Sequence, residues 1–217
     1  TAIADYAPAT RVEIGAQDSG FKVPGNANIT SAYPNQMQSI VIRGEQAYLP
    51  NIASSPLGPL RFNVDTHAFV NVLDNVATGT PADASGAKFK NLHLGARIPE
   101  TGKTKLFFAN PWAIAFTNQS GAGNGYVVSA GSDLLVKVTV DAAGKLDFTG
   151  GISTTRYIDL NDSLNPATQG EKAGKNPLGI VIRDTRAFVM NYISRNVSVV
   201  NLSLDTVESV LKLTNLP

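Results

Sequence analysis

The chain has 217 residues, a formal net charge of +1 at pH 7 and hydrophobic residues at 43% of its positions, enough for one domain with a sizeable core. Its balanced charge, without a cluster of Lys and Arg, argues against a nucleic-acid partner. The absence of cysteine excludes disulfides, thiolate metal sites, thiol catalysis and covalent c-type haem attachment within these residues, and no apolar run is long enough to predict a membrane span.

The first stretch, residues 1–37, is rich in Ala, Gly, Asn, Pro and Ser. Such a composition favours loops, with short strand candidates at residues 11–15 and 20–23. We interpret this stretch as an N-terminal arm or as a partial blade of the repeat found in the rest of the chain.

A first full copy of a repeat covers residues 38–73. Pro50 lies inside its second predicted strand, and because proline removes a backbone donor, an edge or bulge position is expected there. A long insertion, residues 74–105, comes next, and its segment 76–86 (VATGTPADASG) has the composition of a flexible loop. We expect residues 76–85 to be removable without loss of the fold.

The second copy covers residues 106–148 and the last covers residues 176–213, with a second insertion at residues 150–175 between them. The strands of a repeat are fixed by its pattern, whereas its connections differ, and connections often carry function. We therefore expect both insertions to lie on a rim of the fold and to form its contact surface.

The copies are related by a fixed offset. A shift of 140 positions places residues 39–65 on residues 179–205 without a gap, and Ile40 to Arg43 then coincide with Ile180 to Arg183. The middle copy begins in the same way, with NPWAIAF at residues 110–116 against NPLGIVI at residues 176–182. Self-similarity of this kind indicates a repeat architecture.

Each copy contains four short apolar or alternating runs separated by polar turns. In the last copy these runs are residues 179–183, 186–192, 197–202 and 207–213. The period-two alternation of the third run is typical of a strand with one buried face. Four antiparallel strands joined by tight turns and repeated along the chain are typical of β-propeller blades. The predicted fold is therefore all-β, a β-propeller of four-stranded antiparallel blades over residues 38–217, with the Ile-Val-Ile strand innermost.

The motif AFVMNYISRNVSVVNL at residues 187–202 resembles the repeat of YVTN-type β-propellers, which runs aromatic-Val-x-Asn, a small polar turn and then Val-Ser-Val-Ile-Asp. The likeness is fair around Tyr48 and weak in residues 125–140, where Ser129 replaces the Asn. The resemblance implies a bacterial exported protein, periplasmic or extracellular. In some such proteins the propeller is joined to a c-type cytochrome domain similar to di-haem peroxidases, so haem on an associated domain or chain is implied by resemblance.

Three blades are recognisable, whereas propellers typically close with four to eight. Because the apolar faces of terminal blades need a cover, we expect the remaining blades, on a longer parent polypeptide or on a partner protein chain, to complete a larger propeller. Ala47-Tyr48 and Ala187-Phe188 are expected to be equivalent core positions. Truncating Phe188 to Ala is then expected to cost about 3–5 kcal/mol.

The two histidines are the first candidates for catalysis or ligand binding. His67 falls on a hairpin turn of the repeat and is expected to be solvated. His93 lies in the first insertion near Arg97, in a Leu-His-Leu alternation that is typical of a structural residue. Two histidines so far apart do not by themselves predict a zinc or copper centre. The sequence therefore assigns no catalytic, cofactor-binding or metal residue.

Other motifs also have ordinary structural interpretations. Asp159, Asn161 and Ser163 have the oxygen spacing of a calcium loop but lack its Gly and Glu, which favours an Asx turn. The Gly-rich run 121–125 does not join a strand to a helix, so no phosphate site is predicted. Trp112 is expected to pack in the core or between blades.

Two functions of different classes remain. The favoured one is a non-catalytic scaffold or binding module of an exported bacterial protein, within a periplasmic electron-transfer assembly by resemblance, with no cofactor in this chain. The alternative is an enzymatic propeller, such as a metal-dependent lactonase or a quinone-dependent dehydrogenase. Those activities need carboxylate, Asn or His ligands around a central channel, whereas the inner strands begin with Ile40, Ile114 and Ile180.

Overall fold

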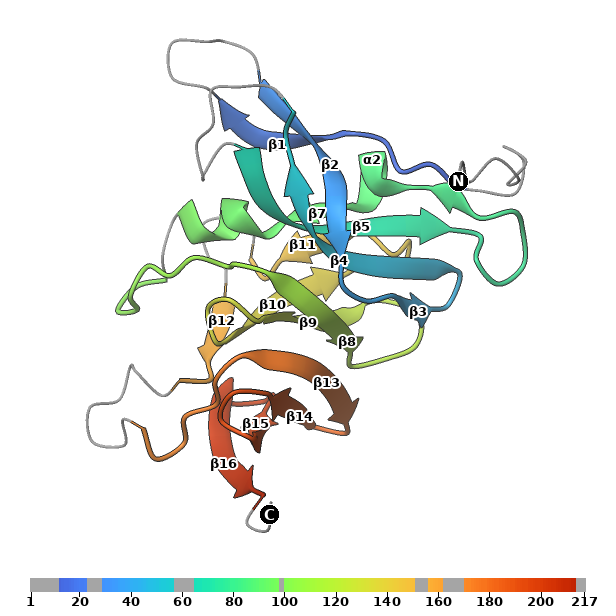
Figure 1. Cartoon of the computed structure of the whole chain (residues 1–217). Helices are drawn as coiled ribbons and strands as arrows, with labels where there is room; N and C mark the ends of the chain where they lie inside the picture. Colours follow the sequence, from blue (N-terminus) through green and yellow to red (C-terminus); the bar gives the residue numbers. More distant parts are fainter. Residues whose placement is uncertain are drawn as a thin grey trace, which may run out of the picture.

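The computed structural model describes residues 12–22, 29–56, 65–97, 100–150, 156–161 and 170–213. Within them the chain is all-β, as predicted, and three antiparallel sheets succeed one another along the sequence and pack together (Figure 1). Two short helical segments lie after β5 (Thr66–Asp74): one turn of α-helix, α2 (Ser85–Lys88), and a 3-10 helix, η2 (Leu92–Arg97). None of the described helices has the length and apolar character of a transmembrane span.

The first sheet contains seven strands: β1 (Gln17–Lys22), β2 (Ile29–Met37), β3 (Val41–Arg43), β4 (Gln46–Ser54), β5 (Thr66–Asp74), β6 (Ala82–Asp83) and β7 (Lys90–Asn91). Their order is β1-β2-β4-β5-β6, while β3 pairs with β4 and β7 pairs with β5. The two long central strands, β4 and β5, therefore organise this sheet.

In the N-terminal stretch, the described residues 12–22 and 29–37 form more strand than their composition predicts. β1 pairs with β2, and β2 pairs with β4, so these residues extend the first sheet and are not mainly a loop. The candidate at 20–23 overlaps β1, whereas residues 12–15 of the other candidate are not in a strand and residue 11 lies outside the described residues. Pairing with a distant strand explains β2, because its polar sequence, with Pro34 next to a register shift, has little strand preference of its own.

Pro50 lies in β4 where the partner strand changes. β3 pairs with β4 as far as Tyr48, and β2 pairs with it from Asn51 onwards. The missing N–H of Pro50 therefore falls between two pairing segments, while its carbonyl accepts a hydrogen bond from the Gln38 amide. Pro50 thus lies in a gap between two pairing segments of a central strand, and the expectation of an edge or a bulge there is corrected.

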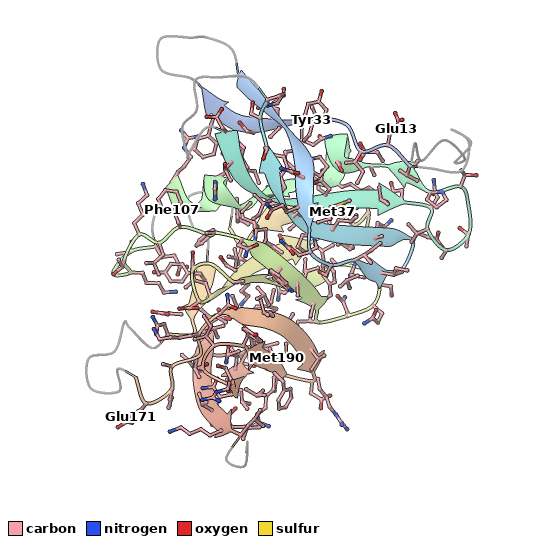
Figure 2. All side chains as sticks on the ribbon, viewed as in Figure 1. Glu13, Tyr33, Met37, Phe107, Glu171 and Met190 are labelled. Carbon is pink, nitrogen blue, oxygen red and sulfur yellow. The ribbon has the colours of Figure 1, made fainter. Side chains whose placement is uncertain are left out.

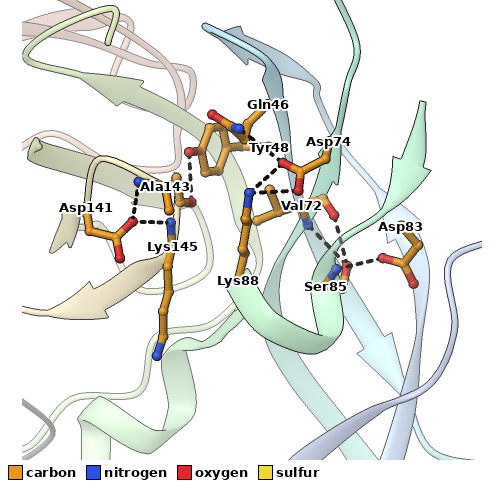
Figure 3. A network of polar contacts seen from close by, with 11 residues as sticks. Gln46, Tyr48, Val72, Asp74, Asp83, Ser85, Lys88, Asp141, Ala143 and Lys145 are labelled. Atoms are coloured by element: carbon orange, nitrogen blue, oxygen red, sulfur yellow. Dashed lines mark hydrogen bonds and ion pairs between the residues drawn. The ribbon is translucent and has the colours of Figure 1, made fainter. Parts of the chain in front are cut away.

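The first insertion is part of the framework of the first sheet. β6 and β7 pair with β5, and α2 lies between them in sequence. Ser85 of α2 is fully buried, and its hydroxyl accepts a hydrogen bond from the Asn71 side chain. It also contacts the Val72 backbone (Figure 3). The expectation that residues 76–85 are removable is therefore corrected, since their deletion would leave buried polar groups of β5 unpaired.

The second sheet contains β8 (Pro111–Phe116), β9 (Gly123–Ser129), β10 (Leu134–Val140), β11 (Leu146–Phe148) and β12 (Arg156–Asp159). Four strands take the order β11-β10-β9-β8, and β12 also pairs with β10. Because β12 belongs to residues 150–175, the second insertion also contributes to a sheet. A contact-surface role for either insertion remains a prediction.

The third sheet has the simplest order, β13-β14-β15-β16. Its strands are β13 (Pro177–Arg183), β14 (Arg186–Asn191), β15 (Asn196–Asn201) and β16 (Thr206–Lys212). The four runs predicted for the last copy coincide with these strands. The register also repeats that of the first sheet, because Val181 pairs with Phe188 as Val41 pairs with Tyr48.

The second sheet is covered on both faces. Ile114 lies on one face, in a core shared with Tyr48 of the first sheet, and Tyr126 lies on the other, in a core shared with Ala187 of the third. Burial of large apolar side chains is worth about 1.5–3 kcal/mol each, so these two cores hold the three sheets together. The first strands β3, β8 and β13 lie near one another, but Ile40 precedes β3 and is exposed, unlike Ile114.

Candidate functional site

His67 is a buried strand residue, and its predicted place in a solvated turn is wrong. β5 begins at Thr66, so the histidine is already inside the strand rather than in the preceding turn. Its ring lies 5.5 Å from that of Phe21 on β1 and 5.6 Å from that of Phe69, measured between ring centroids. The repeat alignment could not predict this burial, because it depends on the extra strand β1.

The structure brings the second histidine beside the first. His93 in η2 is buried, with its ring 5.9 Å from His67 and 5.8 Å from Phe107 between centroids. Its Nδ1 atom is buried without a hydrogen-bond partner in the described part of the chain. Burial, together with the nearby His67, lowers the pKa of His93 to about 4, so His93 is neutral at pH 7.

A small pocket of about 100 Å³ opens beside His93. Its walls combine aromatic rings with two cationic side chains: Phe21, His93, Ala96, Arg97, Lys105 and Phe107. The Arg97 guanidinium lies 5.4 Å from the centre of the Phe21 ring, so it is held by a cation–π contact. Among the described residues, no three His, Cys, Asp or Glu side chains are placed to hold a metal ion together.

The remaining sequence candidates have structural roles where the structure describes them. The Asp159 carboxylate accepts a hydrogen bond from the Asn161 amide at 2.9 Å, the geometry of an Asx turn, while Ser163 lies outside the described residues. Trp112 on β8 packs against the core between the second and third sheets, which confirms its predicted packing role.

Arg43 forms the main polar contact between the first and second sheets, which sequence reasoning missed. Its side chain is 2% exposed. It donates to the carbonyl and side-chain oxygens of Asn118, at 2.9 and 3.0 Å, and to the Gly121 carbonyl. The guanidinium also lies over the Phe116 ring, 5.2 Å from its centre. Arg43 thus binds the turn between β8 and β9, in which the Gly-rich run 121–125 begins.

Tyr48 makes the second polar contact of the same interface. Its ring packs on Phe116, with 4.6 Å between centroids, and its hydroxyl donates to the Gly144 carbonyl at 2.9 Å. This carbonyl belongs to the β10–β11 hairpin, where Asp141 accepts from the Ala143 and Lys145 amides (Figure 3). Burial raises the pKa of Tyr48, so the phenol stays protonated and can donate.

The outer face of the third sheet, turned away from the second sheet, is apolar and uncovered. We define it by the apolar side chains that share the strand register of Phe188: Val181, Phe188, Met190, Val197, Val199 and Leu211. Val199 is buried, whereas Val181 is 64% exposed, and Met190, labelled in Figure 2, and Leu211 are about half exposed. Phe188 is only half-buried, so its predicted equivalence to the fully buried Tyr48 holds for register and not for burial.

The molecule is thus an all-β repeat protein that carries a small histidine pocket at one end and an open apolar sheet face at the other. A scan of family models and a search of curated proteins found no match. Among solved structures, the protein is similar to one chain of the structure titled "Crystal structure of Nidogen/Laminin Complex". The two chains are 13% identical in sequence, the match covers 81% of this chain and 80% of that chain, and the TM-score is 0.28.

Proposed function

We propose that the three sheets are successive blades of a YVTN-type β-propeller and that the chain acts as a non-catalytic scaffold or binding module. The order β13-β14-β15-β16, with a first strand near those of the other sheets, supports the blade interpretation. In this arrangement the chain supplies only part of a ring. The remaining blades, or a partner protein chain, complete it.

The outer face of the third sheet is the observation that carries this proposal. Its apolar side chains continue into an open depression lined by Met190, Tyr192, Ile193, Val197 and Leu213 together with nearby polar residues. Large exposed apolar patches on a folded protein mark interaction surfaces. The binding function therefore belongs to this end of the molecule.

The cellular setting is inferred from the resemblance of residues 187–202 to YVTN repeats. We place the protein in the bacterial periplasm or outside the cell, as part of an electron-transfer assembly whose haem belongs to an associated domain or chain. The enzymatic alternative has less support, because the first strands β8 and β13 carry Ile114 and Ile180 where such enzymes need carboxylate, amide or imidazole ligands.

Two measurements test the proposal. The dilute chain purified alone is expected to bind an apolar fluorescent dye at its open face. A compact monomer without dye binding would contradict a binding role for the open face. Metal analysis of the protein from its natural source is expected to find iron on an associated polypeptide, whereas stoichiometric calcium on this chain would favour the enzyme.

A further inference from the structure

The open face repeats, position by position, the face by which the first sheet packs on the second. The offset of 140 residues relates Val41, Arg43 and Tyr48 to Val181, Arg183 and Phe188. The cross-strand pairs agree, because Arg43 faces Gln46 in the ladder as Arg183 faces Arg186. The two surfaces therefore present equivalent side chains from equivalent backbone positions.

The burial of these equivalent residues differs completely. Val41 packs against the core between the first two sheets, and Arg43 and Tyr48 are fully buried there. In the third sheet, the Arg183 side chain is 87% exposed, and its nearest carboxylate oxygen belongs to the adjacent Asp184 at 3.9 Å. Arg183 of the third sheet is thus equivalent to Arg43 of the first sheet, which binds a turn of the second sheet.

The second sheet shows that the direction of packing is constant along the chain. Tyr126 pairs with Ala115 as Tyr48 pairs with Val41, and its ring lies in the core shared with the third sheet. Beside it, Lys137 forms an ion pair with Asp205, in the β15–β16 hairpin of the third sheet, at 3.0 Å. Tyr48 therefore points to the second sheet and lies near its β10–β11 hairpin, and Tyr126 points to the third sheet and lies near its β15–β16 hairpin. Phe188 points the same way, to the outer face.

We infer that Val181, Arg183 and Phe188 bind a further four-stranded sheet of the same repeat, with Arg183 donating to carbonyl oxygens of that sheet's first turn, as Arg43 does to Asn118 and Gly121. This inference rests on the proposed binding function and names the partner of the open face. The incoming sheet presents an aliphatic and an aromatic side chain from its first strand, as the second sheet presents Ile114 and Phe116.

A second copy of this chain fits the face less well. Head-to-tail stacking would need the outer face of the first sheet, which is already occupied. Phe89, which comes directly after α2, packs on Phe69 with 5.1 Å between ring centroids, and Ser85 of α2 binds Asn71. A neighbouring chain stacked head to tail would have to displace these contacts, which favours a further unit of the repeat as the occupant.

The experiment appends a second copy of residues 106–161 to the C-terminal end of the full chain, because this unit already packs on the equivalent face of the first sheet. Peroxide oxidation of methionine reports on shielding, because the chain has only two methionines and the appended unit has none. Met190 lies on the open face at 51% exposure, and Met37, at 57% exposure on the first sheet, is the internal reference (Figure 2).

We expect the extension to slow oxidation of Met190 relative to Met37 at least fivefold. Arg183→Ala in the extended chain should restore most of the original rate. The matched control Lys212→Ala, which removes an exposed cation from the opposite face of the third sheet, should leave the shielding intact. Unchanged Met190 oxidation, or an extension that stays unfolded beside this face, would overturn the inference.

Two further results separate this inference from the proposed function. If the unextended chain dimerises and Met190 is shielded in the dimer, the binding function stands but a second copy is the occupant. If Met190 is already shielded in a dilute monomer, the open face does not exist and both proposals fail.

Independently of the extension, Arg43→Ala should speed amide exchange at Val41 and Tyr48 at least tenfold. No change would remove the basis for assigning a binding role to Arg183.

Discussion

The first and third sheets carry similar residues in the same register, yet one surface is the centre of an interface and the other faces solvent. Tyr48 and Arg43 are buried because the second sheet supplies Phe116, Asn118 and the Gly144 carbonyl as partners. The third sheet keeps the equivalent side chains without such a neighbour. The repeat therefore encodes the surface of each sheet, whereas the burial of that surface depends on a neighbouring sheet.

The largest effect is expected from the buried aromatic residue of the first sheet. Tyr48→Ala should lower the free energy of unfolding by about 3–5 kcal/mol, because it removes a fully buried ring and a buried hydrogen bond. Tyr48→Phe, which keeps the ring, should cost only about 1 kcal/mol. Chemical denaturation measures both, and equal losses for the two variants would show that the ring does not carry the packing.

A pH dependence is expected from the histidine pocket at the first-sheet end. The folded state lowers the pKa of His93 to about 4 from its ordinary 6.5, so the unfolded chain binds the proton more tightly. Stability should be full above pH 6.5 and fall as the pH decreases to 4, by up to about 3 kcal/mol. In the His93→Gln variant this part of the pH dependence should disappear; a profile identical to that of the parent would contradict the assignment to His93.

The two arginines provide the most specific contrast between the sheets. Arg43→Ala should cost about 2–3 kcal/mol, because it removes a buried guanidinium together with its charge-assisted hydrogen bonds to Asn118 and Gly121. Arg43→Lys should not rescue it fully, since lysine lacks the planar fork that reaches Asn118 and Gly121 together. Arg183→Ala in the chain alone should change stability by less than about 0.5 kcal/mol. Similar losses at both positions would mean that Arg183 already has a structural role.

The smallest effect is expected at Phe188. Sequence equivalence with Tyr48 predicted a cost of about 3–5 kcal/mol for Phe188→Ala, but the ring is half-buried on an open face, so we now expect about 1 kcal/mol. Thermal or urea unfolding of the single variant decides between these values. A loss above 3 kcal/mol would show that the open face is covered in solution.

The sequence predicted the parts of the fold that depend on local pattern. The four strands of the third sheet are predicted by alternation and polar turns, and the equivalence of Val41 and Val181 is predicted by the offset. β2 was missed because pairing with the distant β4 orders it. The burial of His67 was missed for the same reason, since β1 and η2 cover a residue that the repeat assigns to a turn.

The candidate sites were even less predictable from the sequence, because they also depend on contacts between distant segments. Nothing local relates His67 to His93, because their proximity is created when η2 folds back on β5. Arg43 and Arg183 could have been found from the repeat, as two arginines ending equivalent strands. Only the structure shows that the first of them binds a turn of the second sheet.

Thiol accessibility tests the contrast between the two faces most directly, because the chain has no cysteine of its own. The variants Val41→Cys and Val181→Cys place one thiol at each of the equivalent positions, and labelling of the dilute folded protein with a small maleimide measures their exposure. We expect Val181→Cys to react at close to the rate of an unfolded control and Val41→Cys at least tenfold more slowly. Equal protection of both thiols would contradict an open face on the third sheet.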